Sequence, residues 1–298
     1  MSAPLSIDQV GPYKATFIGT VRSEWIKLFT LRSTWWLLSA GVVINIGLCA
    51  MLALANWSMY GYEVTTDPNY PPPDNLGMVS EQVVAMCGLF GQLIFLLVAI
   101  LSVTNEYSSG MIRATYTVGP RRSRVLAAKM TVVAGVGLVF FGLSLVVGWG
   151  VFYLIVRGVP GFDLSLASAT SLRILGGFVV EMVLLAWLFL GLAAWLRSTA
   201  GTIGVTIGII WILPLMLFIV NTTIAVGVSA DLGWEPTGWI KWLSDAEKCL
   251  PTNAGGLVTQ ADMPQDALFG PWTGLGVLGI WTFVGLFIGF LATDNRDA

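Results

Sequence analysis

The sequence contains no histidine and few charged residues. Asp, Glu, Lys and Arg make up 11% of the 298 residues, whereas a soluble domain carries about 25% charge. Without histidine the chain lacks the commonest metal ligand and the usual proton shuttle near neutral pH. Ser-His and Cys-His catalytic pairs are therefore excluded, and we predict no metal site on this chain.

Other chemical signatures are missing as well. The three cysteines lie in two hydrophobic runs (Cys49 and Cys87) and in one polar loop (Cys249), which does not describe a disulfide framework. A Gly-x-x-x-x-Gly-Lys phosphate loop is absent, so the chain is not expected to bind ATP in that manner. The sequence has no strongly charged tail of the kind that would suggest a nucleic-acid partner, and we expect none. We expect no catalytic residue and no cofactor on this chain.

Hydrophobic residues, in contrast, make up 56% of the sequence, and the mean hydropathy is +0.79. A helix needs roughly 20 apolar residues to cross a bilayer. Six stretches qualify: about 33–57, 82–104, 130–156, 174–196, 199–226 and 271–293. We predict an all-α polytopic membrane protein. Its expected parts are a cytoplasmic segment (1–34), a six-span domain (35–293) and a cytoplasmic tail (294–298).

The basic residues predict the orientation of these spans. Of 15 Lys and Arg residues, only Arg157, Arg173, Lys241 and Lys248 lie in the loops assigned to the outer side. Those outer loops are acidic. Because Lys and Arg accumulate in cytoplasmic loops, both termini are expected to be cytoplasmic, in a cell (plasma or inner) membrane.

Two segments are predicted to lie along the membrane. On a helix over 17–31, apolar and polar side chains separate: Phe17, Val21, Trp25, Leu28 and Leu31 share one face, and Ser23, Lys27 and Thr30 lie opposite. Such a helix contacts lipid at the interface, either as a simple anchor or as an elbow that also touches a cytoplasmic subunit. The tryptophan-containing segment 236–243 and the prolines after it predict a re-entrant or surface-lying helical cap on the outer side.

Polar and helix-breaking residues within the spans are few. Glu181 is an in-membrane acid, which is costly and usually faces a partner or a polar cavity. Pairing with Arg173 and a functional role are both open. Pro214 is expected to kink the fifth span. The pairs Gly204/Gly208 and Gly285/Gly289 have the spacing of close helix packing.

The loop over 105–129 is the most specific pattern in the chain. It holds five basic residues and one acid. On a helix starting at Tyr107, the side chains of Met111, Ala114 and Val118 continue an apolar stripe, and Gly119-Pro120 ends the helix. We predict a short helix across the inner ends of two spans, followed by a basic cluster.

These motifs resemble the type-2 ABC exporter permease family, which includes ABCG-like membrane domains. The resemblance rests on Asn105 to Arg113 followed by Pro120-Arg121-Arg122, on Ser23-Glu24-Trp25-Ile26-Lys27-Leu28 near the amino terminus, and on Leu250-Pro251-Thr252-Asn253-Ala254. Met111 stands where threonine is commoner. With the six-span layout, the resemblance covers nearly the whole chain.

The resemblance implies the membrane subunit of an exporter driven by ATP hydrolysis. Its Mg-ATP would be bound by a separate ATPase, present in two copies, and a second permease chain would complete a homodimer or heterodimer. The residues implied to couple to the ATPase are Glu106, Tyr107, Gly110, Met111, Ile112, Arg113, Tyr116, Pro120, Arg121 and Arg122. Trp25, Lys27 and Arg32 belong to the implied connecting helix. The implied substrate pathway contains Gln92, Phe95, Trp211, Met216 and Asn221.

Three alternatives stay open at this stage. A secondary carrier would show internal repeats and ionic sites at mid-membrane, and a membrane-embedded enzyme would show a cluster of catalytic side chains. A membrane scaffold would show no nucleotide-dependent change. A hydrophobic or amphipathic substrate is expected, but its identity does not follow from the sequence.

Overall fold

The computed structural model describes residues 16–58, 66, 76–111, 122–157, 168–229, 238–264 and 267–295. Every regular element within these residues is a helix, which confirms the predicted all-α fold. The elements are α1 (Phe17–Thr30), α2 (Arg32–Asn56), α4 (Leu76–Ser108), α6 (Arg122–Val156), α7 (Ala169–Leu196), α8 (Thr199–Ile207), the π-helix η3 (Gly208–Ile212), α9 (Leu213–Ser229), α10 (Gly238–Lys248), α11 (Pro251–Gly256), the 3-10 helix η4 (Leu257–Thr259) and α12 (Pro271–Asn295).

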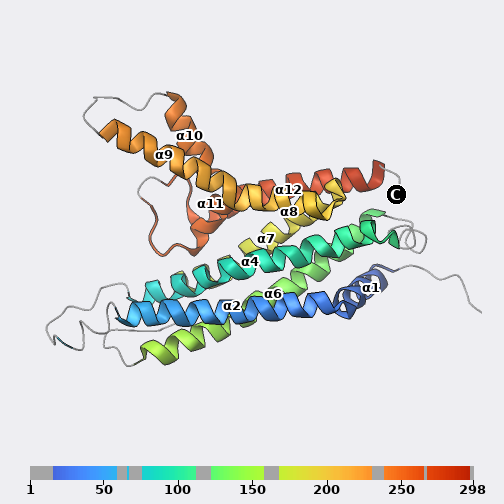
Figure 1. Cartoon of the computed structure of the whole chain (residues 1–298), viewed down its shortest axis with the longest axis horizontal. Helices are drawn as coiled ribbons and strands as arrows, with labels where there is room; N and C mark the ends of the chain where they lie inside the picture. Colours follow the sequence, from blue (N-terminus) through green and yellow to red (C-terminus); the bar gives the residue numbers. More distant parts are fainter. Residues whose placement is uncertain are drawn as a thin grey trace, which may run out of the picture.

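Six of these segments are long and apolar enough to cross a membrane, as predicted. They are α2, α4, α6, α7, the continuous α8–η3–α9 and α12. The helix α7 lies at the centre, in contact with α12, α4 and α6, and α2 packs against α4 and α6. Among the six, α7 is the most buried and α8–η3–α9 the least. Figure 1 shows α9 diverging from the bundle of α2, α4 and α6 and carrying α10 beside it.

Close packing of α7 on α12 depends on glycine. A Cβ atom added to Gly191 would lie 2.5 Å from the carbonyl oxygen of Gly285, and one added to Gly289 would lie 2.6 Å from the carbonyl oxygen of Gly191. The backbones of the two helices therefore touch, as small residues allow in membranes. The predicted packing role of Gly285/Gly289 is confirmed. For Gly204/Gly208 it is wrong within this chain, because no atom lies within 4 Å of an added Cβ.

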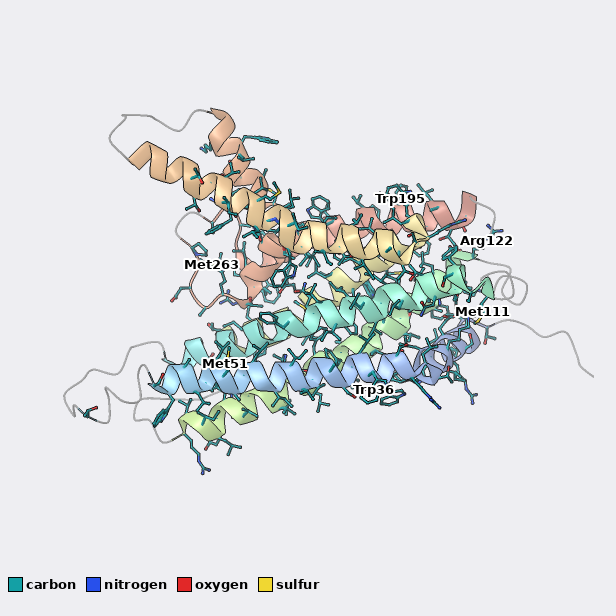
Figure 2. The ribbon with its side chains drawn as sticks, in the orientation of Figure 1. Trp36, Met51, Met111, Arg122, Trp195 and Met263 are labelled. Atoms are coloured by element: carbon teal, nitrogen blue, oxygen red, sulfur yellow. The ribbon has the colours of Figure 1, made fainter. Side chains whose placement is uncertain are left out.

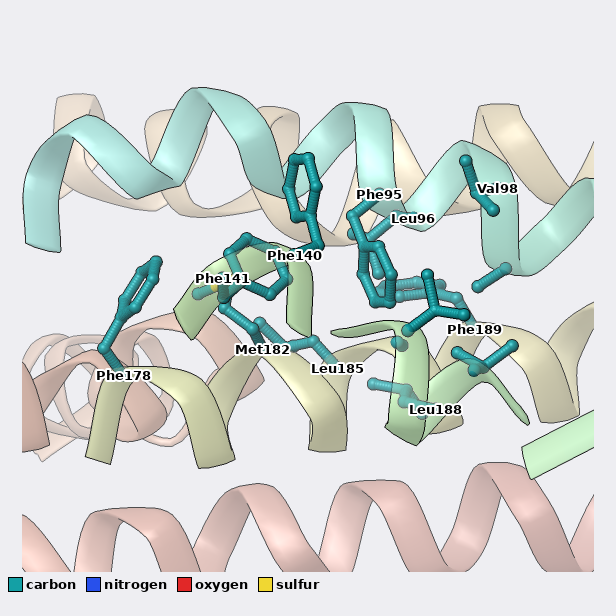
Figure 3. Packing of buried hydrophobic residues seen from close by; sticks show 14 of the residues in the cluster. Phe95, Leu96, Val98, Phe140, Phe141, Phe178, Met182, Leu185, Leu188 and Phe189 are labelled. Atoms are coloured by element: carbon teal, nitrogen blue, oxygen red, sulfur yellow. The ribbon is translucent and has the colours of Figure 1, made fainter. Parts of the chain in front are cut away.

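An aromatic cluster fills the space between α4, α6 and α7 (Figure 3). The ring centroids of Phe95 and Phe141 are 5.1 Å apart, and those of Phe141 and Phe178 are 5.5 Å apart, both with edge-to-face geometry. Phe95 is only 1% exposed. The ring of Phe95 is therefore enclosed by its own neighbours, and this packing does not support its predicted place on a substrate pathway.

The fifth span is irregular where proline was predicted to disturb it. Pro214 follows the π-helix η3, and the backbone N–H of Leu213 donates to the carbonyl of Gly208, five residues earlier. Proline has no N–H to donate, so the helix widens by one residue next to it. A tight turn precedes this span. Arg197 ends α7 with a φ of 53°, and the Ser198 hydroxyl caps α8 by accepting from Gly201 N.

The segment predicted as an outer cap contains two helices, α10 and α11. The shorter, α11, packs mainly against α12, and the following η4 contacts both α7 and α12. A Cβ on Gly274 would lie 2.2 Å from the Ala254 carbonyl oxygen, so α11 sits directly on the α12 backbone. The indole N–H of Trp281 donates to the Cys249 carbonyl at 2.9 Å. These contacts hold the short helices against the bundle.

The two ends of the bundle differ. Figure 2 shows Met111 and Arg122 at the end that also holds α1, whereas Met51 and Met263 lie toward the opposite end. We call the first the basic end and the second the far end. The basic end gathers stretches that are distant in sequence, because α1, the end of α4 and the start of α6 meet there.

Candidate functional site

Four charged side chains form one ion-pair cluster at the basic end. Lys129 of α6 lies 2.5 Å from a carboxylate oxygen of Glu24 and 2.9 Å from one of Glu106, and it also donates to the Ser102 carbonyl. Lys27 lies 2.7 Å from Glu24 and 2.9 Å from Glu106. We call these four residues the basic-end cluster. Two acids and two lysines balance in charge, and they join α1, α4 and α6.

Most of the charged groups in this cluster are buried, which has an energetic cost. Glu24, Glu106 and Lys129 are 4–6% exposed. A buried charge is costly unless it is paired and hydrogen-bonded, so each of the three holds the others in place. Lys27 is partly exposed. Burial acts to lower its pKa, but hydrogen bonds to Glu24 and Glu106 outweigh that effect and raise the pKa above its ordinary 10.5. Lys27 therefore stays charged at neutral pH.

The cluster corrects the predicted surroundings of Lys27 on α1. The sequence pattern placed Lys27 toward headgroups, opposite the face that holds Trp25 and Leu28. Instead Lys27 pairs with Glu106 of α4, and Glu24 and Leu28 are the buried residues of α1. Trp25 is 43% exposed and packs beside Phe29, with ring centroids 4.6 Å apart. The periodicity of α1 alone could not predict this contact, because the partner of Glu24 is Lys129 of another helix, α6.

The cluster also corrects the start of the predicted coupling helix. Tyr107 belongs to the last turn of α4, which runs to Ser108, and a break follows at Gly110 with a φ of +70°. The Tyr107 ring lies under the Arg197 guanidinium, 5.1 Å from its centroid. The next described residue, Met111, is 49% exposed. The helix α4 thus continues past the predicted end of the span at residue 104, and Glu106 with its ion pairs lies in this added turn.

The remaining predicted coupling residues fall in two groups. Ile112, Arg113, Tyr116, Pro120 and Arg121 lie outside the described residues. Arg122 begins α6 and donates to the Thr293 carbonyl at 3.4 Å, which links α6 to the end of α12. Arg32 of the predicted connecting segment is exposed and begins α2. The predicted role of Glu106 as a contact for another subunit is not supported, because its carboxylate is buried and paired within this chain.

A cavity of about 460 Å³ borders the cluster. Its apolar walls come from α1, α4 and α6, and include Leu28, Leu101 and Val132. Its polar part includes the cluster itself, together with Asn105 and several hydroxyl side chains of α1 and α4. The cavity therefore lies between the element predicted to connect and the two spans that flank the 112–121 segment.

A second cavity, of about 670 Å³, lies toward the far end. Its lining comes from α4, α7 and η3 on one side and from residues 248–269 on the other. We call it the far-end cavity. It brings together two of the predicted pathway residues, Gln92 and Trp211, with the in-membrane acid Glu181. Glu181 and Gln92 are nearly inaccessible, at 2% and 3% exposed.

Other predictions for this region are corrected. Arg173 does not pair with Glu181, because its guanidinium donates to the carbonyls of Gln260 and Ala261 at 2.8 and 3.3 Å. Of the other pathway residues, Met216 lies on α9 with 59% of its surface exposed, and the Asn221 amide donates to Glu247 of α10. Neither lines the far-end cavity.

The sequence analysis did not predict the pair formed by Glu24 and Lys129, although Glu24 is a charged residue on the otherwise apolar face of α1. It also did not predict that residues 248–269 form one wall of a cavity. Within the described residues, no group of three or more His, Cys, Asp or Glu side chains is placed to hold a metal ion.

The family described as ABC-2 family transporter protein matches residues 20–213. The chain belongs to this family. The match begins in α1 and ends just past η3, so it includes the whole basic-end cluster and the α4, α7 and η3 walls of the far-end cavity. No curated protein matches the chain significantly. The chain is thus a multi-pass membrane protein of the ABC-2 transporter family, and its role is that of a permease.

Proposed function

We propose that the chain is the permease subunit of an ATP-driven exporter for a hydrophobic or amphipathic molecule. Two copies of a separate ATPase would bind and hydrolyse Mg-ATP, and a second permease chain would complete a homodimer or heterodimer. The observation that carries this proposal is the basic-end cluster. It joins α1 to the two spans that flank the 112–121 segment, within a chain of the ABC-2 transporter family.

Transmission of force through this end follows from the cluster. An ATPase that moves the 112–121 segment displaces the end of α4 and the start of α6 together. Lys129 ties both displacements to α1 through Glu24 and Glu106, at 2.5 and 2.9 Å. Because these ions are buried, separating them is unfavourable, and the three helices move as one unit. Glu106 therefore acts as an internal tie, while Arg113 and Ile112 are the proposed contacts with the ATPase.

The proposed membrane arrangement places the basic end in the cytoplasm, together with both termini, in the cell membrane. It is supported by the excess of Lys and Arg in the stretches that meet at this end. The proposed substrate path begins with Gln92 and Trp211, which the far-end cavity brings together. Met216 and Asn221 enter the path only if a second permease chain or another conformation covers α9.

Replacing Arg113 by Ala should separate the permease from its ATPase without unfolding the permease. Removing a charged interfacial contact typically costs a few kcal/mol (about 2), which corresponds to roughly thirtyfold weaker binding. The measurement is affinity of the purified permease in lipid nanodiscs for its cognate ATPase, with ATP hydrolysis by the complex as a second readout.

Arg157→Ala is the matched control, since Arg157 is an exposed basic residue after the opposite end of α6. It should leave both quantities unchanged. Equal affinities for Arg113→Ala and the unaltered chain would remove the 112–121 segment from the interface. If the unaltered permease shows no ATPase binding at all, the proposed exporter function is wrong.

A further inference from the structure

Three side chains that line the far-end cavity each hold a buried polar atom without a hydrogen-bond partner: Oε2 of Glu181, Nε2 of Gln92 and Oγ1 of Thr252. Buried polar atoms are nearly always hydrogen-bonded, and the exceptions call for an explanation. The Glu181 oxygen is an acceptor on α7, the Gln92 nitrogen is a donor on α4, and the Thr252 hydroxyl on α11 can donate or accept. A molecule that carries a donor and an acceptor close together would satisfy the first two.

Among the described residues, no basic side chain forms an ion pair with the Glu181 carboxyl group. Arg173 is directed to the carbonyls of Gln260 and Ala261. On the other side, an added Cβ at Gly255 would lie 3.2 Å from Cγ and 3.3 Å from Oε1 of Glu181. The α11 backbone therefore sits against the carboxyl group and presents no cation to it. Lys248, on α10, is the other charged side chain of the described cavity lining.

The rest of the cavity is suited to an apolar body. The rings of Phe90 and Trp211 pack edge-to-face with their centroids 6.2 Å apart. The apolar side chains of Leu257, Leu268 and Phe269 form more of the wall. Aromatic faces attract cations as well as apolar groups. The volume of about 670 Å³ falls within the range of small-molecule sites. The cavity thus combines an apolar wall with an open acceptor on Glu181, an open donor on Gln92 and the open hydroxyl of Thr252.

Charge in the sequence next to the cavity-lining segments favours a cation. Ten acids lie in the two stretches between the first and second spans and between the fifth and sixth spans: Glu63, Asp67, Asp74, Glu81, Asp231, Glu235, Asp245, Glu247, Asp262 and Asp266. Only two basic residues, Lys241 and Lys248, accompany them in these stretches. A net charge of one sign raises the local concentration of ions of the other sign.

We propose that the far-end cavity binds an amphipathic amine that carries a hydroxyl oxygen next to its ammonium group. The ammonium donates to Oε2 of Glu181, the hydroxyl oxygen accepts from Nε2 of Gln92, and the apolar part lies against Phe90 and Trp211. This inference rests on the proposed transport function, because it names the class of molecule that the permease carries.

The test compares ligands that share one apolar body. Propranolol carries a naphthyloxy group, a hydroxyl and a secondary ammonium; its glycol analogue, 3-(1-naphthyloxy)propane-1,2-diol, lacks the ammonium, and 1-naphthyloxyacetate is an anion. Equilibrium binding to the full chain in lipid nanodiscs is measured with empty nanodiscs as the background. We expect the amino alcohol to bind at least tenfold more tightly than either analogue. Equal binding of the amine and the diol would overturn the proposal.

Variants then locate the site. Glu181→Gln keeps the shape of the side chain and should weaken binding of the amine at least tenfold while leaving the diol unaffected. Gln92→Leu should weaken both hydroxyl-bearing ligands several-fold. Asp294→Asn, an exposed acid at the basic end and outside the cavity lining, is the control and should bind as the unaltered chain does. If Glu181→Gln does not elute as a folded protein, the ligand series on the unaltered chain decides.

The outcome is separable from that of the exporter test. Ligand binding is measured on the permease without its ATPase, whereas ATPase affinity is measured without ligand. Loss of amine selectivity with intact ATPase binding would overturn only the ligand class. Unaltered amine binding by Glu181→Gln would likewise place the site elsewhere.

Discussion

Replacing Lys129 by Met is expected to destabilise the protein by about 3–5 kcal/mol, the cost of removing one partner from a buried ion pair. The substitution leaves Glu24 and Glu106, at 4% and 5% exposed, facing each other without their shared lysine. Lys27 reaches both carboxylates but lies at the edge of the cluster. The measurement is the free energy of unfolding in mixed micelles at neutral pH.

Two companion variants test the cause of this loss. Lys27→Met should cost much less, because Lys27 is 31% exposed and water replaces part of its interaction. The triple variant Lys129→Met, Glu24→Gln and Glu106→Gln removes the uncompensated charges and should regain a large part of the stability, since a neutral buried set is often tolerated. Equal losses for Lys129→Met and Lys27→Met would contradict the assignment of Lys129 as the centre of the cluster.

The second large effect is expected at the contact of α7 with α12. Gly191→Ala adds a single methyl group, which would lie 2.5 Å from the Gly285 carbonyl oxygen and 2.8 Å from the nitrogen of Leu286. Backbone atoms cannot move aside as a flexible side chain does. Overpacking of this kind costs about 1–3 kcal/mol or more, so the variant should unfold at a lower temperature and express poorly.

Gly204→Ala provides the matched control for this substitution. Nothing lies within 4 Å of its added Cβ, and Ala is favoured over Gly within a helix by roughly 0.5–1 kcal/mol. The two glycine substitutions should therefore shift stability in opposite directions. Thermal unfolding of both variants in the same detergent measures this, and destabilisation of equal size would contradict the proposed backbone contact. A Gly204 contact made only between two permease chains would appear as a loss confined to the dimer.

The predicted spans agree with the structure because hydrophobicity over about 20 residues is a local property. The turn at Arg197 and the disturbed helix before Pro214 were predictable for the same reason, since one residue fixes each backbone feature. The end of α4 was misplaced by comparison. The apolar stripe beginning at Tyr107 indicated a separate helix, whereas α4 extends to Ser108. Glu106 in this last part of α4 forms ion pairs with Lys27 of α1 and Lys129 of α6.

The candidate sites were predicted only in part. Gln92 and Trp211 were predicted as pathway residues because their spans line the pathway in the resembling family. Both line the far-end cavity, and their place on a pathway stays a prediction. Phe95, one helical turn from Gln92, lies in the aromatic core instead. The sequence contains no information on the rotation of α4 about its axis, and that rotation decides which of these side chains reaches the cavity.

The sequence by itself determined that this protein is a helical membrane protein with six spans and an uneven distribution of basic residues among the stretches that connect them. These properties follow from composition and from patterns within single helices. Only the tertiary structure decided the partner of each buried polar group: Glu24 with Lys129, Arg173 with backbone carbonyls, and Glu181 with an open cavity. The physical reason is that a buried charge is satisfied across helix interfaces, and which helices are neighbours is not written in any one of them.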